Sequence, residues 1–148
     1  MKLSTKGRYG VRLMMELAMH YGKKAVALSD ISAQQRISQK YLWQLITPLK
    51  KAGFISSTRG AHGGYCLTRH PSQINLKEIV VTLEGSLFPA ACVEDASVCS
   101  RCSICATRDV WEKVGKKIME VLESVTLEDI IKAQKQKFEK NLLSMYFI

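Results

Sequence analysis

The sequence contains no apolar run that approaches the roughly 18 residues needed to span a membrane. Its N-terminus lacks both the apolar stretch and the small-residue cleavage site of a secretory signal. The three histidines (His20, His62 and His70) are scattered, and no grouping of acid, base and nucleophile typical of catalysis is visible. We therefore expect a cytoplasmic protein that is not an enzyme and does not bind a membrane.

Acidic residues are scarce in the first half of the chain. Residues 1–70 contain twelve Lys or Arg but only Glu16 and Asp30 as acids, a net charge of +10. Residues 71–148 contain ten basic and eleven acidic residues, a net charge of −1, so the whole of the positive net charge of +9 comes from the first half. This asymmetry indicates a polyanionic partner for the N-terminal half alone.

Three helices are predicted in the first 53 residues, each with residues at its ends that favour starting or stopping a helix. The first runs from near Ser4 to Gly22, the second covers residues 30–35 after Ser29 as N-cap, and the third runs from Ser38 to Gly53. The second and third are short and separated by a tight turn, which is typical of a helix-turn-helix. Pro48 lies inside the third helix and predicts a bend there.

The segments 54–58 and 65–68 flank a glycine-rich turn and predict a β-hairpin, which would form the wing of a winged helix. Further helices are predicted at 76–84, at about 107–124, and from a capping box at Thr126. The expected fold is mainly α, of the α+β winged-helix type. We expect a DNA-binding domain (1–85), a cysteine-rich loop (86–106), and dimerisation helices with a tail (107–148).

Four of the five cysteines fall within fourteen residues: Cys92, Cys99, Cys102 and Cys105. In a chain with no secretion signal, thiolates this dense indicate a metal or cluster more often than a disulfide framework. The last three follow the Cys-x2-Cys-x2-Cys spacing of bacterial ferredoxins, although the Cys-Pro that completes that pattern is absent. Structural zinc and metal-free redox thiols are the alternatives, and Cys66 is interpreted as a small buried hydrophobe.

Several stretches together resemble the Rrf2 family of bacterial winged-helix regulators, especially its iron–sulfur cluster regulator (IscR-like) branch. They are residues 1–9 (MKLSTKGRY), 30–32 (DIS), 41–45 (YLWQL), 59–65 (RGAHGGY), and the cysteine cluster followed by Trp111. The resemblance implies a homodimer with the long helix at 107–124 in its interface. It also implies transcriptional control of iron–sulfur assembly, stress or sulfur metabolism.

The resemblance also implies a ligand set. The three cysteines of the IscR-like pattern are matched by Cys92, Cys99 and Cys105. Its histidine, three residues after the last cysteine, is replaced by Arg108, and the residue that other branches recruit from the partner's first helix is matched by Arg8. We therefore expect Cys102 to be the fourth ligand of a 4Fe–4S or 2Fe–2S cluster; the remaining candidates are Glu94, Asp95 and Asp109.

DNA contacts are expected from three regions. The start of a recognition helix meets base edges in helix-turn-helix proteins, and here it carries Ser38, Gln39, Lys40, Tyr41 and Gln44. At the tip of the wing, Arg59 beside Gly60 can enter a narrow minor groove. Contacts to the DNA backbone are expected from Lys2, Lys6, Arg8, Lys50 and Lys51. Because a dimer needs a two-fold site, we expect a roughly palindromic operator.

The sequence thus predicts a DNA-binding regulator that senses iron–sulfur cluster status, redox state, nitric oxide or iron. A cluster-free repressor of cysteine or sulfur metabolism in the same family is the nearest alternative. A small electron-transfer protein is the alternative from a different class.

Overall fold

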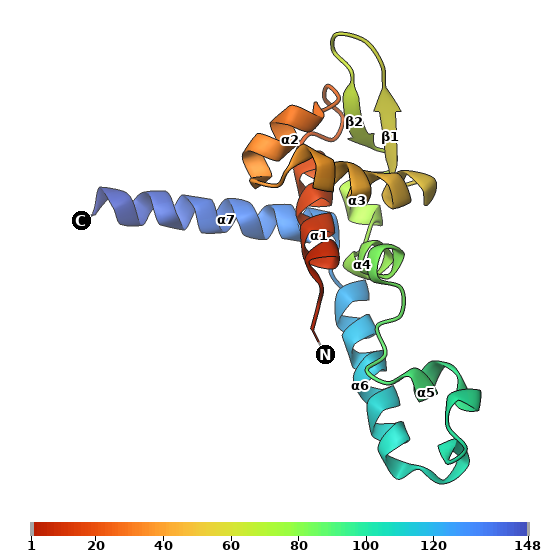
Figure 1. Ribbon diagram of the computed structural model, residues 1–148. Helices are drawn as coiled ribbons and strands as arrows, with labels where there is room; N and C mark the ends of the chain where they lie inside the picture. Colours follow the sequence, from red (N-terminus) through yellow and green to blue (C-terminus); the bar gives the residue numbers. More distant parts are fainter. Residues whose placement is uncertain (1, 148) are drawn as a thin grey trace.

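The computed structural model describes residues 2–147. They form a helical head (residues 2–85), a stem (residues 86–123) and a projecting C-terminal helix (residues 127–146) (Figure 1). The head contains a two-stranded sheet. In chain order the elements are α1 (Thr5–Met19), α2 (Leu28–Gln35), α3 (Gln39–Lys51), β1 (Ile55–Thr58), β2 (Gly64–Leu67), the 3-10 turn η1 (Pro71–Gln73), α4 (Leu76–Glu84), α5 (Ala91–Glu94), η2 (Ala96–Val98), η3 (Cys102–Ile104), α6 (Ala106–Glu123) and α7 (Leu127–Tyr146).

The core of the head lies among α1, α2, α3 and α4. Its fully buried side chains recur at helical spacing on the inner face of each helix, as an amphipathic pattern requires; they include Leu13, Met14, Leu17, Ile31, Leu42, Leu45, Leu49 and Ile79. This packing fixes α3 across the head, next to the hairpin, in the arrangement of a winged helix-turn-helix.

A buried polar network joins α1 to the end of α2. Glu16 is only 4% exposed, and its Oε2 accepts a hydrogen bond of 2.6 Å from Nε2 of Gln35. Nε of Arg12 donates to Oε1 of Gln35 over 3.1 Å. The chain then turns through Arg36, whose positive φ of 53° lies in the left-handed region. The turn that sets the direction of α3 is therefore held by side chains from α1.

The hairpin stands out from the head as a thin wing (Figure 1). Its antiparallel register pairs Ile55 with Leu67 at the base and Thr58 with Gly64 at the top. Gly64 has no room for a Cβ, because the Val26 carbonyl lies against it. Val26 and Tyr65 form a further antiparallel bridge, which ties the wing to the segment before α2.

Most predicted helices are confirmed by their caps. Ser4 accepts from the Lys6 N–H at the start of α1, and Ser38 from the Tyr41 N–H at the start of α3. Asn75 with Glu78, and Thr126 with Asp129, form capping boxes. Pro48 does not end α3, which continues to Lys51 with its apolar side chains directed inward.

Two expectations were wrong in detail. α2 begins at Leu28 after Ala27, so Ser29 lies inside the helix and is not its N-cap. The physical reason is the bridge between Val26 and Tyr65, which keeps the chain extended up to the point where the helix starts. Residues 86–105 are not a plain loop either, because they contain α5, η2 and η3.

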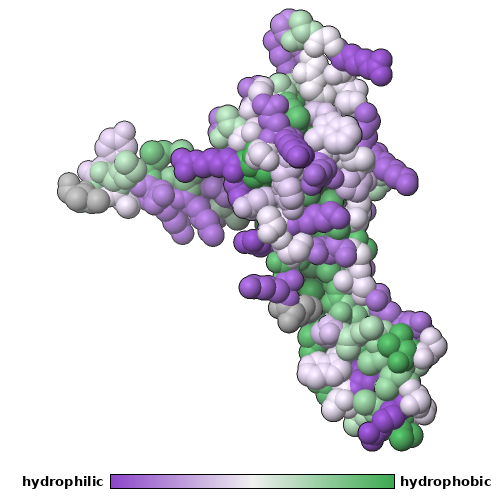
Figure 2. All heavy atoms as spheres, in the orientation of Figure 1, coloured by the Kyte–Doolittle hydropathy of each residue, from purple (hydrophilic) through white to green (hydrophobic). Residues whose placement is uncertain are grey.

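Two helices outside the head expose hydrophobic side chains. Hydrophobic residues are visible along the stem and near the end of the projecting helix (Figure 2). On α6 the exposed apolar residues are Val110, Trp111, Val114 and Val121, and on α7 they are Phe138, Leu142, Leu143, Met145 and Tyr146. Within residues 2–147, no helix combines the length and apolar character that a membrane span requires.

Candidate DNA-binding surface and cysteine segment

The start of α3 presents most of the residues expected to read bases. The side chains of Gln39, Lys40 and Gln44 are exposed, whereas Tyr41 is half-buried. The Tyr41 ring packs edge-on against Tyr9 of α1, with 5.9 Å between ring centroids. The Tyr41 ring therefore packs between α3 and α1, and a DNA contact by Tyr41 stays a prediction.

Trp43 was not among the predicted contacts, although its side chain is 59% exposed on α3. An indole this open on a surface helix buries little apolar area in the free protein and remains available to a partner. The sequence could have suggested it, because Trp43 lies between the predicted contacts Tyr41 and Gln44. We add Trp43 to the candidate DNA-binding surface.

The wing presents Arg59 and Gly60 at its exposed tip. Gly60 has a φ of 106°, a conformation that side chains disfavour, so the tight tip depends on glycine at this position. Nζ of Lys50 donates a hydrogen bond of 2.6 Å to Oγ of Ser57, which links the end of α3 to the wing. Lys51 next to it is exposed.

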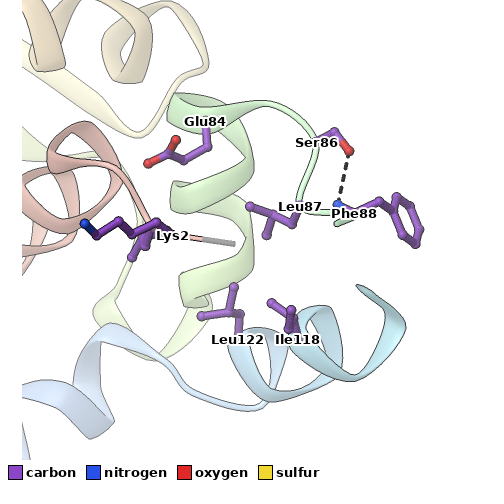
Figure 3. A pocket seen from close by; sticks show the side chains of 8 residues that line it. Lys2, Glu84, Ser86, Leu87, Phe88, Ile118 and Leu122 are labelled. Carbon is purple, nitrogen blue, oxygen red and sulfur yellow. Dashed lines mark hydrogen bonds between the residues drawn. The ribbon is translucent and has the colours of Figure 1, made fainter. Parts of the chain in front are cut away.

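The first turns of α1 carry the other expected backbone contacts. Lys6 and Arg8 are exposed, and the Arg8 guanidinium lies 5.9 Å from the centroid of the Tyr9 ring. Because Tyr9 also touches Tyr41, the start of α1 is linked to the start of α3. Lys2 instead lines a cavity between α4 and α6, on the stem side of the head (Figure 3). A phosphate contact by Lys2 stays a prediction.

The cysteine segment, defined as residues 86–105, runs from the end of α4 along α6, and its short elements lie at the end of the stem away from the head (Figure 1). None of the four clustered cysteines, all within the described residues, forms a disulfide. Cys99 and Cys102 line an open cavity of about 480 Å³ together with Arg108. Sγ of Cys102 lies 3.8 Å from the Cys92 carbonyl. The fold thus places Cys99 and Cys102 beside one cavity, with the backbone carbonyl of Cys92 next to Cys102.

The thiols differ in acidity. Desolvation raises the pKa of Cys102, and the neighbouring Cys99 and Cys92 raise it further, while Arg108 opposes them. The Thr107 hydroxyl, 3.2 Å from Sγ, lowers the pKa of Cys105, with smaller contributions from backbone N–H groups and Arg101. Of these two thiols, Cys105 is therefore the one more readily converted to a thiolate, the form that binds metals.

The donor set fits an iron–sulfur cluster in its chemistry, because four thiolates in one short segment are the usual ligands of such clusters. Zinc accepts the same donors. In the part of the chain that the structure describes, however, no three His, Cys, Asp or Glu side chains are close enough to hold one metal ion. Four-fold ligation would require the cysteine segment to close further around the space it surrounds.

Arg108 holds α5, within the cysteine segment, on α6. Its Nε donates to the Cys92 carbonyl over 2.9 Å, and Nη2 donates to the Val93 carbonyl over 3.4 Å. Asp95 is also engaged, because its Oδ1 accepts from the N–H and hydroxyl of Ser97. Arg108 therefore acts as a clamp on the segment, and the Asp95 carboxylate is less free to act as a ligand than a cysteine.

Replacing Arg108 with Gln should loosen the cysteine segment. The variant loses the two bonds to the Cys92 and Val93 carbonyls, each charge-assisted and worth about 1.5–3 kcal/mol when formed by a charged donor. Hydrogen exchange of residues 91–95 in the cluster-free protein should accelerate, whereas exchange in α2 stays as in wild type. Lys113→Gln, on an exposed position of the same helix, is the matched control. Unchanged exchange in Arg108→Gln would show that the clamp contributes nothing.

Similarity to known proteins assigns this chain to a family. A family model described as Rrf2, an iron-dependent transcriptional regulator, matches residues 3–133. The chain belongs to the Rrf2 family. It is therefore a transcriptional regulator, and the mainly helical winged-helix fold expected from its sequence is confirmed.

Individual Rrf2-family proteins match over nearly the same range. The chain is 41% identical to protein rrf2 of Nitratidesulfovibrio vulgaris over 132 residues, 89% of this chain and 88% of that protein. Among solved structures, IscR of T. potens has 44% identity and a TM-score of 0.77, covering 93% of this chain and 90% of that one. CymR of B. subtilis, the global cysteine regulator of that organism, has 39% identity and a TM-score of 0.76, covering 90% of this chain and 98% of that one.

Proposed function

We propose that the DNA affinity of this Rrf2-family regulator depends on whether its cysteine segment carries an iron–sulfur cluster. The observation that supports this most directly is the arrangement of Cys92, Cys99, Cys102 and Cys105. These free thiols lie in one segment on the stem, connected through α4 to the head that carries the recognition helix. The segment proposed to sense the cluster and the helix proposed to contact DNA are therefore separate parts of one chain.

The cluster-holding residues would be Cys92, Cys99 and Cys105, with Cys102 as the fourth. A bound cluster would supply sensitivity to oxidants, nitric oxide or iron supply. The protein's own residues would do the rest. Arg108 keeps the Cys92 end of the segment on α6 and balances the negative charge of the thiolates, and Thr107 favours the thiolate of Cys105.

A homodimer and a palindromic operator belong to the same proposal. Val110, Trp111, Val114 and Val121 leave a long apolar strip open on α6. Such a strip on a soluble helix usually marks a protein contact, and a self-complementary contact generates two-fold symmetry. Two recognition helices related in this way would read the two halves of a roughly palindromic site.

A second candidate function is that of a cluster-free regulator of cysteine or sulfur metabolism. It is favoured by the likeness to the global cysteine regulator CymR and by the spacing of the cysteine side chains, which are not yet at ligand distance in the described residues. Family membership favours both regulators over the electron-transfer protein also considered from the sequence.

Anaerobic purification separates the two candidates. The proposal expects brown protein with iron and acid-labile sulfide in about equal amounts, and salt-dependent binding to DNA fragments selected from a random pool. Colourless protein that lacks iron but binds the selected fragments would leave the cluster-free regulator. Protein that contains zinc alone would show that the cysteines have a structural role.

A further inference from the structure

Glu84, the last residue of α4, holds the beginning of α1. Its Oε1 accepts hydrogen bonds from the backbone N–H of Ser4 over 3.1 Å and of Gly7 over 2.9 Å, and also from the Ser4 hydroxyl. The first turn of α1 contains no acidic residue of its own. A carboxylate from a different element therefore satisfies the free N–H groups there and complements the positive end of the helix dipole.

The two helices are in direct contact at this point. Gly7 is buried with no room for a Cβ, because the Glu84 side chain lies against it. One turn further along, Gly10 is equally close to Leu83. These glycines let α1 and the last turn of α4 approach closely, so a displacement of one is transmitted to the other.

The cysteine segment starts at Ser86, two residues after Glu84. Gly85, with a φ of 80°, ends α4, and Ser86 and Leu87 follow beside Glu84 (Figure 3). The ring of Phe88 lies against Gly115 of α6 so closely that a Cβ there would not fit. The segment is thus anchored on the stem only four residues after Glu84. A cavity of about 270 Å³ at this junction leaves its side chains space to move.

On the other side of the contact between Glu84 and α1, the first turns of α1 lie against the recognition helix α3. The first turns of α1 carry Arg8 and Tyr9, and the Tyr9 ring packs on Tyr41 near the start of α3. Phe88 is thus linked to Glu84 through the short backbone segment 85–87, and Glu84 is linked by contacts through the first turns of α1 to Tyr41.

We propose that Glu84 is the positioning residue through which the state of the cysteine segment reaches the DNA-binding surface. If the thiolates closed around a cluster, the segment would displace the end of α4. The hydrogen bonds from Ser4 and Gly7 to Glu84 would change with it. These hydrogen bonds set the position of the first turns of α1 and, through the packing of Tyr9 on Tyr41, the position of α3. This inference rests on the proposed function, because it needs two states of the segment.

The test compares DNA affinity of cluster-loaded and cluster-stripped protein in wild type and in Glu84→Ala. Wild type should show a ratio of dissociation constants in the usual range for coupled sites, about 5- to 150-fold, and Glu84→Ala should reduce that ratio to within about twofold. Asp129→Ala is the matched control, because Asp129 is a carboxylate that caps the start of α7 in the same way. It should lower thermal stability comparably and leave the ratio unchanged. Glu84→Gln, which keeps an acceptor oxygen, should restore part of the ratio.

Hydrogen exchange on wild-type protein gives a second readout that needs no variant to fold. The amides of residues 4–7 should differ in protection between loaded and stripped protein, while those of α7 should not. Equal protection of residues 4–7 in loaded and stripped protein would overturn the role of Glu84 but not the proposed function. A wild-type ratio of dissociation constants in Glu84→Ala would do the same. Equal DNA affinity of loaded and stripped wild type would overturn the proposed function together with this inference.

Discussion

Cys99→Ala should remove the visible absorption of anaerobically purified protein completely. Cys99 is exposed and lines the open cavity of the cysteine segment, so its thiol contributes little to packing. Its loss leaves three cysteines in the segment, fewer than the four thiolates that usually hold a 2Fe–2S or 4Fe–4S cluster. The variant should keep its thermal stability without iron, because no hydrogen bond or core contact of the head is changed.

Cys66→Ala is the matched control for this experiment. Cys66 lies on β2, and its Sγ is 3.1 Å from Oγ of Ser56 on the paired strand. It is part of the wing and outside the cysteine segment, so its removal should leave the absorption spectrum and the iron content unchanged. A Cys99→Ala protein with the wild-type spectrum would contradict the proposed ligand set, as would loss of the chromophore in Cys66→Ala.

Arg59→Ala should weaken binding to the selected operator by about 1–3 kcal/mol per half-site, roughly 5- to 150-fold. The guanidinium stands at the exposed tip of a wing that Gly60 keeps narrow and that the bond between Lys50 and Ser57 ties to α3. An arginine in this position can enter a minor groove, where the negative potential is concentrated when the groove is narrow. Arg59→Lys should recover only part of the loss, because lysine is a more strongly hydrated point charge.

Lys140→Ala is the control for the change in net charge. Lys140 is exposed on the distal half of α7, which projects away from the wing (Figure 1). Its removal should lower affinity only slightly, by the general electrostatic contribution that salt screens. Dissociation constants should be measured on one fragment at two salt concentrations. Equal losses for Arg59→Ala and Lys140→Ala would show that the wing tip makes no specific contact.

The elements that the sequence predicted well have local signals. Ser4, Ser38, Asn75 and Thr126 each cap the helix that follows, and the cap and the apolar spacing lie within a few residues of each other. The wing was predictable for the same reason, because its turn chemistry lies between two short β-type segments. Dense cysteines are also a local signal, and they identified the candidate sensor segment.

The features that escaped prediction depend on contacts between distant residues. The start of α2 is set by the bridge between Val26 and Tyr65, and no pattern near Ser29 reports that bridge. Glu84 and Ser4 are 80 residues apart, so the carboxylate that caps α1 could not be found by scanning its neighbours. The short turns in the cysteine segment are too brief for a periodic pattern.

The most direct test of cluster sensing is a DNA titration of one anaerobic preparation before and after removal of its iron. The same operator fragment and salt concentration are used for both states, and circular dichroism verifies that the stripped protein stays folded. The account predicts brown protein whose dissociation constant changes by at least about fivefold when it becomes colourless. An identical dissociation constant for the brown and the colourless protein would contradict it.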